Sequence, residues 1–367
     1  MTGRYRYLAY DLRTNVALDE LPLADVSYGG VLNRPGPFSA TLKVTKRTAQ
    51  LRRTNSTPER TIVYVERDGA IQDAYIIWTR RTKPAPAPLQ LTGASVLSFL
   101  YRNRIVTSPA PFTAVDQFTI AFAILTMMQT QVGADIGIIA GTPSTCGVVR
   151  NRTYYAYERK NVGVALEQLS EVNSGFDLGI DITKNVSGVP VKTLNLSYPR
   201  RGRIAGTTGL IFELGKNLID YEIIEDGTRS ARSVDAFGGG DGADMLISTQ
   251  TNTALIDAGF PLTSDSIAHK DVIVQATLDA HARSAVDASS ATPMFLRLQI
   301  KPDDPDGGLG HWILGDDALV RIPNDINFPR QSDGSPGLSG YYRLLTYDVD
   351  VPDAGKDIVW LTAGRVS

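Results

Sequence analysis

Alternating apolar and polar positions dominate the first part of the chain. From Phe38 to Thr45 every second side chain is apolar, which predicts a strand with one buried face and one solvated face. Two β-branched and aromatic runs, at 61–67 and 74–81, flank Asp68-Gly69, a pair that favours a two-residue hairpin turn. These patterns predict a sheet.

A short helix is expected to close this first part. Within 95–104 the apolar residues Val96, Phe99 and Leu100 lie on one side of a helical projection. We therefore place a β-rich domain at 1–104.

After residue 105 the apolar residues recur every three or four positions, instead of at every second position. Helical spacing predicts one amphipathic helix over 115–129 and a second that begins after Asn161, a favourable capping residue. The strand alternation returns at 176–182. We expect residues 105–205 to form an α+β insertion.

The remaining residues, 206–367, are predicted to be β-rich with one long helix. An Asp226-Gly227 turn predicts a hairpin between a strand around Tyr221 and a strand around Val234, followed by the glycine-rich stretch 238–242. The helix is expected over 266–288. Three strands should follow: 294–301 with Met294, Leu296, Leu298 and Ile300 inward, one around 345–351, and 358–361.

Composition excludes several classes of protein. The chain has 367 residues, of which 43% are hydrophobic and 21% charged, with a net charge of -2. This balance argues against disorder and against general attraction to nucleic acid or anionic membranes. Cys146 is the single cysteine, which excludes internal disulfides and multi-cysteine metal sites.

The sequence also bears on where the protein is made. The amino terminus lacks a signal-peptide core, and no apolar run reaches the ~18 residues of a spanning helix, so we expect synthesis in the cytoplasm. The arginine pairs 52–53, 80–81 and 200–201 are interpreted as solvated strand ends.

Candidate chemistry is sparse, and we assign no catalytic, cofactor-binding or metal-binding residue. His269, His281 and His311 lack metal-motif or triad spacing, and Ser339 lies outside a nucleophile elbow. The stretch 238–242 lacks the Gly-Lys-Ser/Thr of a phosphate loop and carries Asp241 and Asp244 around it. The acidic stretch Asp303–Gly308 is interpreted as a solvated hairpin loop, and calcium binding there stays an open alternative. The clustered tyrosines are interpreted as core or interface packing residues: Tyr154, Tyr155, Tyr157, Tyr341 and Tyr342.

Several stretches together carry a family resemblance. They are the opening strands through PFSATL, LTGASVLSFLYRNRIV at 91–106, SYPRRGR at 197–203, the Leu-Gly-x-Asn-Leu motif at 214–218, and Leu314-Gly315-Asp316. Their collinear order resembles the tail-tip, or baseplate, hub proteins of long-tailed bacteriophages, usually called minor tail proteins in actinobacteriophages.

The resemblance implies a fold and an assembly. It implies an α+β, mainly β protein in which two tail-tube-like β-barrel domains, 1–104 and 206–367, flank the insertion at 105–205. It further implies a non-enzymatic homotrimeric ring of the virion tail tip that adapts the sixfold tube or distal tail ring to threefold tip components. The implied partners are distal tail or tube protein above, fibres or other minor tail proteins below, and tape measure protein and genomic DNA in the channel.

Two alternatives stay open. One is a hexameric distal tail adaptor, and the other is a module that binds or hydrolyses host-surface glycans. Many tail hubs continue into a peptidase or lysozyme domain, so a chain that ends at Ser367 is expected to lack lytic activity.

Overall fold

The computed structural model describes residues 3–84, 87–172, 174–207, 209–228, 230–240, 242–269, 272, 274–290 and 294–366. Strands hold 41% and helices 17% of the residues, so the predicted α+β, mainly β class is confirmed. Two compact units are present, Met1–Tyr221 with Arg297–Ser367, and Glu222–Leu296. Within the described part of the chain, no helix is long and apolar enough to cross a membrane.

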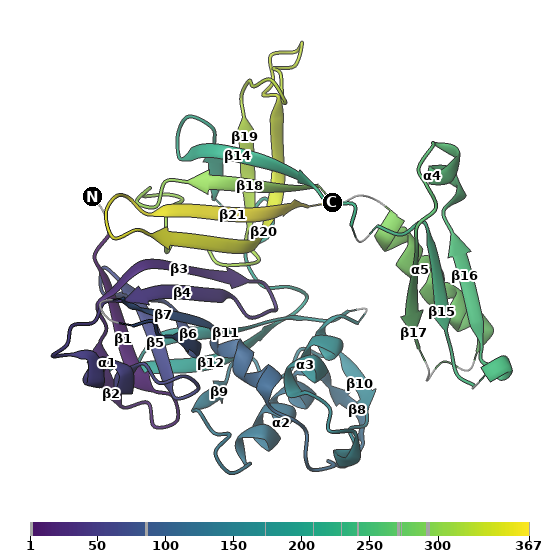
Figure 1. The fold of residues 1–367 in the computed structure, drawn as a ribbon. Coiled ribbons are helices and arrows are strands. Elements are labelled where there is room, and N and C mark those ends of the chain that lie inside the picture. The colour runs from purple at the N-terminus through teal and green to yellow at the C-terminus, as the bar shows by residue number, and fades with distance from the viewer. Residues whose placement is uncertain are drawn as a thin grey trace. The chain divides into compact units, whose positions relative to one another are not determined.

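The amino-terminal part of the first unit is built of strands, as the sequence predicts (Figure 1). Phe38, Ala40 and Leu42 are buried and their neighbours are not, as predicted. The hairpin at Asp68-Gly69 forms as predicted, with φ of 52° and 87°. This part contains β1 (Tyr5–Asp11), β2 (Ala17–Glu20), β3 (Leu23–Val31), β4 (Pro37–Leu42), α1 (Ala49–Asn55), β5 (Thr61–Arg67), β6 (Ala70–Arg81) and β7 (Leu89–Ser95).

The α+β part of the first unit begins with the short helix predicted near 95–104, which is a 3₁₀ helix. The two longer helices are capped as their sequences require: Asp116 accepts from the Phe118 amide at 2.8 Å, and Asn161 from the Val164 amide at 3.1 Å. The elements are η1 (Val96–Arg102), β8 (Phe112–Asp116), α2 (Gln117–Gln129), β9 (Ile138–Ala140), β10 (Val149–Arg152), η2 (Ala156–Glu158), α3 (Val162–Ser170), β11 (Asp177–Lys184) and β12 (Pro190–Ser197).

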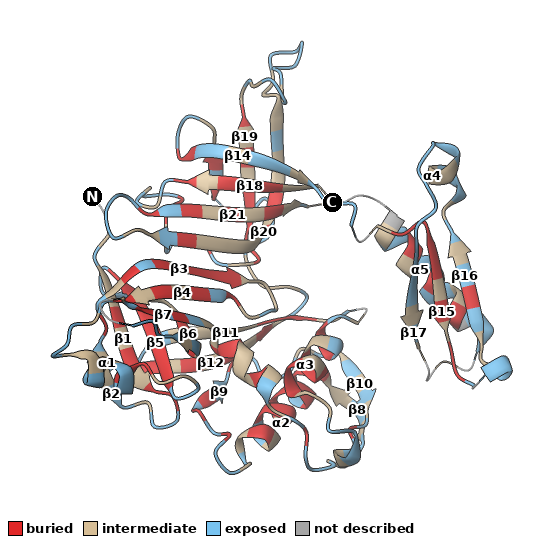
Figure 2. Cartoon of the chain, viewed as in Figure 1, coloured by how far each residue is buried: buried red, intermediate tan, exposed pale blue. Residues whose placement is uncertain are grey.

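One hydrophobic core joins these two parts. Ile62, Tyr64 and Ile76 of the amino-terminal sheet pack in the same buried cluster as Phe118 of α2 and Leu166 of α3. Figure 2 shows the buried segments on β1, β5, α2 and α3. The α+β part is therefore built onto the amino-terminal sheet.

A long strand, β20, connects the amino-terminal strands to the carboxyl-terminal strands. Its first half pairs with β19 and its second half with β3, while β21 follows it on the other edge. The strand order is β14-β18-β21-β20-β3-β4-β7-β6-β5-β1-β2, with β13 and β19 branching from β20. These strands are β13 (Ile211–Glu213), β14 (Leu218–Glu225), β18 (Met294–Ile300), β19 (Asp317–Ile322), β20 (Leu338–Val351) and β21 (Ile358–Arg365).

The predicted barrels are not confirmed, because no sheet among the described strands closes on itself. Between β13 and β14 the structure shows an isolated bridge between Leu214 and Leu218 and a hydrogen bond from the Gly215 amide to the Leu218 carbonyl at 3.1 Å. The Asn217 side chain takes the place of further ladder bonds: it donates to the Ile211 carbonyl at 2.8 Å and accepts from the Glu213 amide at 3.0 Å. The strand ladder therefore stops at this point.

The second unit is a small sheet covered by a helix. Its strands lie in the order β16-β15-β17, and Ala236 of β15 is buried against Leu278 and Ala282 of α5. Its elements are β15 (Ser233–Phe237), η3 (Gly242–Asp244), β16 (Ile247–Thr251), α4 (Thr253–Asp257), β17 (Ser264–Ala268) and α5 (Gln275–Ser290).

The hairpin predicted at Asp226-Gly227 is wrong. Strand β14 neighbours β18, whereas β15 is the central strand of the separate three-stranded sheet. The Asp226 carboxylate accepts from the Thr228 amide at 2.9 Å and from its hydroxyl at 2.6 Å, a local turn that does not return the chain along β14. An Asp-Gly pair predicts that the chain reverses direction, but it does not determine which strand pairs with β14.

The long helix also starts later than predicted. Residues 264–268 form β17, which pairs in parallel with β15, and the helix begins at Gln275. Tertiary strand pairing overrides the helical spacing there.

Replacing Leu296 by aspartate should unfold the protein. Leu296 of β18 is fully buried, so the change removes a buried side chain and introduces an unpaired charge, a loss of about 4 kcal/mol or more. Urea unfolding followed by circular dichroism measures it. The control Gln299→Asp lies on the opposite face of the same strand and should change stability much less; equal losses would contradict the register.

Candidate functional site

The histidines and the serine considered from the sequence do not converge on one centre. His269 and His281 stack on each other at 4.2 Å in the second unit, whereas the His311 carbonyl accepts from Arg203 at 2.8 Å in the first. Ser339 is exposed on β20 opposite Arg321. No group of three or more His, Cys, Asp or Glu residues with metal-binding geometry occurs in the described part of the chain.

The acidic loop after β18 is held by protein donors. Asp304 accepts from the amides of Asp306 at 3.1 Å and Gly307 at 2.9 Å, and Asp303 forms an ion pair with Arg67. These carboxylates organise the loop itself.

The glycine-rich stretch makes a tight turn. A Cβ on Gly240, whose φ is +101°, would lie 2.4 Å from the Asp244 carbonyl oxygen, so glycine is required there. Asp241 lies outside the described residues.

The tyrosines divide between the interior and the surface. Tyr154 and Tyr342 are buried, Tyr341 is half-buried, and Tyr155 and Tyr157 are exposed with their rings stacked at 5.1 Å.

The arginine segment at 200–203 is not a solvated strand end, contrary to the prediction. Arg200 pairs with Asp317, Arg201 with Asp181, and Arg203 with Asp316. Side chains of Arg200 and Arg201 are only 22% and 14% exposed, so burial accompanies the pairing. The sequence offered no signal for these ion pairs, because the partners of Arg200 and Arg203 lie more than 100 residues away along the chain.

Two carboxylates at the start of β19 fix this segment. Asp316 is fully buried and accepts from the Arg203 amide at 2.6 Å, the Arg203 guanidinium at 2.6 Å and the Ile313 amide at 3.0 Å. Asp317 accepts from the Ala205 amide at 2.7 Å. We call the pairs of Arg200 and Arg203 with these carboxylates, together with Arg343 and Asp177, the arginine clamp.

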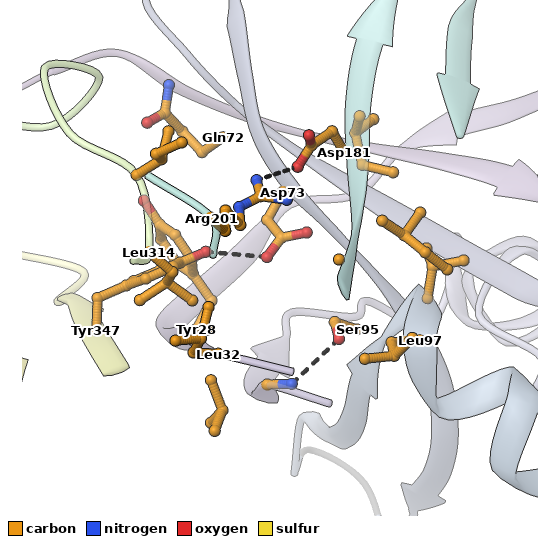
Figure 3. Close-up of a pocket in the computed structure, with 18 of the residues that line it drawn as sticks. Tyr28, Leu32, Gln72, Asp73, Ser95, Leu97, Asp181, Arg201, Leu314 and Tyr347 are labelled. Atoms are coloured by element: carbon orange, nitrogen blue, oxygen red, sulfur yellow. Dashed lines mark hydrogen bonds and ion pairs between the residues drawn. The ribbon is translucent and has the colours of Figure 1, made fainter. Parts of the chain in front are cut away.

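A cavity of about 410 Å³ lies beside the clamp within the first unit (Figure 3). It forms where the amino-terminal sheet, the α+β part and the loop before β19 meet. Its walls include Tyr28, Gly30, Asn33, Arg34, Gln72, Asp73, Ser95, Leu97, Ile180, Asp181, Arg201, Trp312, Ile313, Leu314 and Tyr347.

Asp73 of β6 is the central polar group of this cavity. It accepts from the Tyr347 hydroxyl at 2.9 Å, the Tyr75 hydroxyl at 3.2 Å and the Ala74 amide at 2.7 Å. Burial raises the pKa of Asp73 to about 6, because these hydrogen bonds only partly offset the cost of removing the carboxylate from water. Sequence reasoning missed this residue, since a single aspartate within a strand matches no motif.

Removing the charge of Asp316 should weaken the fold. Asp316→Asn removes the buried carboxylate that accepts from the Arg203 and Ile313 amides and from the Arg203 guanidinium, whose side chain is 48% exposed, a loss of about 1–3 kcal/mol in the free energy of unfolding. Chemical denaturation measures it. Glu20→Gln, which breaks the exposed pair with Arg6, is the control and should have little effect; similar losses in both variants would contradict a structural role for the clamp.

Asp73 should make stability depend on pH. The folded protein holds a proton on Asp73 that the unfolded chain, with the ordinary pKa of 3.8, releases. The resulting stabilisation is therefore fully present below about pH 4 and is lost as the pH rises through about 6. The free energy of unfolding of the wild type minus that of Asp73→Asn should fall as the pH is raised from 3.5 to 7.5. A difference that stays constant with pH would contradict this role of Asp73.

Comparisons place the fold among phage tail proteins. No family model and no curated protein sequence matches the chain. A tail protein from Neisseria meningitidis is 12% identical, with a TM-score of 0.58 over 98% of this chain and 96% of that one. A 43 kDa prophage tail protein from Shewanella oneidensis is 10% identical, with a TM-score of 0.59 over 99% and 98%.

A third similar structure comes from a secretion machine. It is an Escherichia coli component of the type VI secretion system, described as structurally similar to T4 tail proteins gp27 and gp5. It is 8% identical, with a TM-score of 0.50 over 95% of this chain and 74% of that one. The resemblance to phage tail proteins drawn from the sequence is thus confirmed at the level of the fold: the chain has the fold of phage tail and baseplate proteins.

Proposed function

We propose that this protein is a structural component of a bacteriophage tail tip, where three copies form a hub ring around the DNA channel. The observation that carries the proposal is the fold match to two phage tail proteins, which spans nearly the whole length of all the chains. The third similar structure, with its described likeness to T4 tail proteins, supports a position in the baseplate.

The arrangement of strands supports a ring in which neighbouring copies cover one another. Strands β2 and β14 end the strand path of the large sheet among the described residues. Ile219 of β14 is 50% exposed and Ile223 is 37% exposed. Exposed sheet edges and apolar side chains of this kind favour association.

The three-part division remains part of the proposal. Residues 1–104 supply β3 and the strands that follow it in the sheet order, and residues 206–367 supply β20 with β19 and β21. We propose that each of these two parts forms a tube-like barrel when neighbouring copies assemble. Two such parts per chain would give a trimer six similar surfaces toward a sixfold tube or distal tail ring. Residues 105–205 form the insertion between them.

The partners follow from that position. Distal tail or tube protein would dock above, and fibres or other minor tail proteins below, with tape measure protein and genomic DNA in the channel. The protein would be made in the host cytoplasm and incorporated into the virion. We propose a non-enzymatic role, since the histidines and the serine considered from the sequence do not converge on one centre.

The decisive experiment is the rotational symmetry of this chain in electron cryomicroscopy of intact tail tips. We expect threefold symmetry beneath the tube, and a mass in solution three times the monomer's 39.8 kDa after assembly. A sixfold ring would replace the hub by the distal adaptor. Absence from the particle, with glycan binding or cleavage by the purified chain, would overturn both structural roles.

A further inference from the structure

The cavity beside the arginine clamp has the size of a ligand site. Its volume of about 410 Å³ falls in the range of about 300–1,000 Å³ found for small-molecule pockets. All of its walls belong to the first unit and to described residues. It can therefore be considered as a binding site on its own.

The charges around the cavity do not cancel locally. Arg201 pairs with Asp181, and Arg34 pairs with Glu167 and Glu171, so both cations have carboxylate partners. Asp73 has only neutral donors, and no basic side chain in the described part of the chain pairs with it. Tyr75 on β6, Tyr347 on β20 and Asp181 on β11 act on Asp73 directly. The other titratable and charged groups in the cavity wall are Tyr28 on β3 and Arg34 and Arg201 from the loops.

Much of the remaining wall is apolar, with Asn33, Gln72 and Ser95 as neutral polar groups. Trp312 and Tyr347 lie edge to face at 5.5 Å, and Ile313, Leu314 and Ile180 line the cavity with them. Such walls suit methylene groups, as the stems of lysine and arginine pack on apolar surfaces while the charged head finds a polar partner. A carboxylate that has neutral donors but no cationic partner, beside apolar side chains, fits a ligand with an apolar stem and a cationic head.

Other ligand classes fit less well. An anion would meet Asp73 and Asp181, while both arginines are already paired. A metal ion requires several protein ligands, and the described residues offer no group of three His, Cys, Asp or Glu side chains for it.

We propose that this pocket binds a cationic group, a primary ammonium or a guanidinium on an aliphatic stem, with Asp73 as its counter-ion. The group comes either from a lysine or arginine side chain of a neighbouring protein or from a free aliphatic polyamine. The bound cation supplies the positively charged partner that the Asp73 carboxylate does not have among its protein donors. This inference does not depend on the proposed place in the tail.

The first test is direct binding to the full-length protein at pH 7.5. The probes are Nα-acetyl-lysine amide, Nα-acetyl-arginine amide and 1,4-diaminobutane, with Nα-acetyl-norleucine amide as the neutral match of the lysine stem. We expect saturable binding of the cationic probes by calorimetry, and at least tenfold weaker binding of norleucine.

The variants assign the site. Asp73→Asn should weaken binding of the cationic probes at least tenfold, whereas Asp350→Asn, the same change at an exposed position of β20, should leave it unchanged. Tighter binding of the amino-acid amides than of the diamine would assign the site to a protein side chain, and the reverse order would assign it to a polyamine. Equal binding of norleucine, or binding unaffected by Asp73→Asn, would overturn the proposal.

The pH dependence provides a test that does not rely on the folding of Asp73→Asn. Affinity for the lysine amide should rise with pH as Asp73 ionises. Tyr347→Phe removes a hydroxyl that stabilises the carboxylate, so the midpoint of that rise should move to higher pH. An affinity that is independent of pH, or a midpoint unmoved by Tyr347→Phe, would overturn the assignment of Asp73.

Discussion

The arginine clamp is the interaction on which the arrangement of the first unit depends. Asp316 and Asp317 are almost entirely buried at the start of β19, where a carboxylate is stable only if cations and amides neutralise it. Arg200 and Arg203 supply those partners from the segment that leaves β12. Because detachment would leave the two buried carboxylates without their cationic partners, separating this segment from β19 is unfavourable.

The clamp also connects parts of the chain that the strand ladder does not. Arg343 on β20 pairs with Asp177 on β11, and Asn33 donates to the same Asp177 at 2.8 Å. Together with β20, which pairs with both β19 and β3, these contacts hold the α+β part and the two sets of strands in one unit.

The cavity is a consequence of that junction. Three parts of the chain meet there, and the side chains at the meeting point do not fill the space. Asp73 is tolerated there because two tyrosine hydroxyls and an amide satisfy its oxygens, while burial and the neighbouring Asp181 raise its pKa. A satisfied but uncompensated carboxylate in an open cavity is a feature of binding sites more than of cores.

The sequence by itself determined the local elements, and the tertiary structure decided their partners. Capping by Asp116 and Asn161 and the alternation through Phe38 act within a few residues, so the pattern predicted those elements correctly. The partner of β14, the pairing of Arg203 with Asp316 and the cavity around Asp73 could not be predicted, because each joins residues more than 60 positions apart. Local periodicity carries no information on which distant segment satisfies a strand edge or a buried charge, and only the folded chain supplies it.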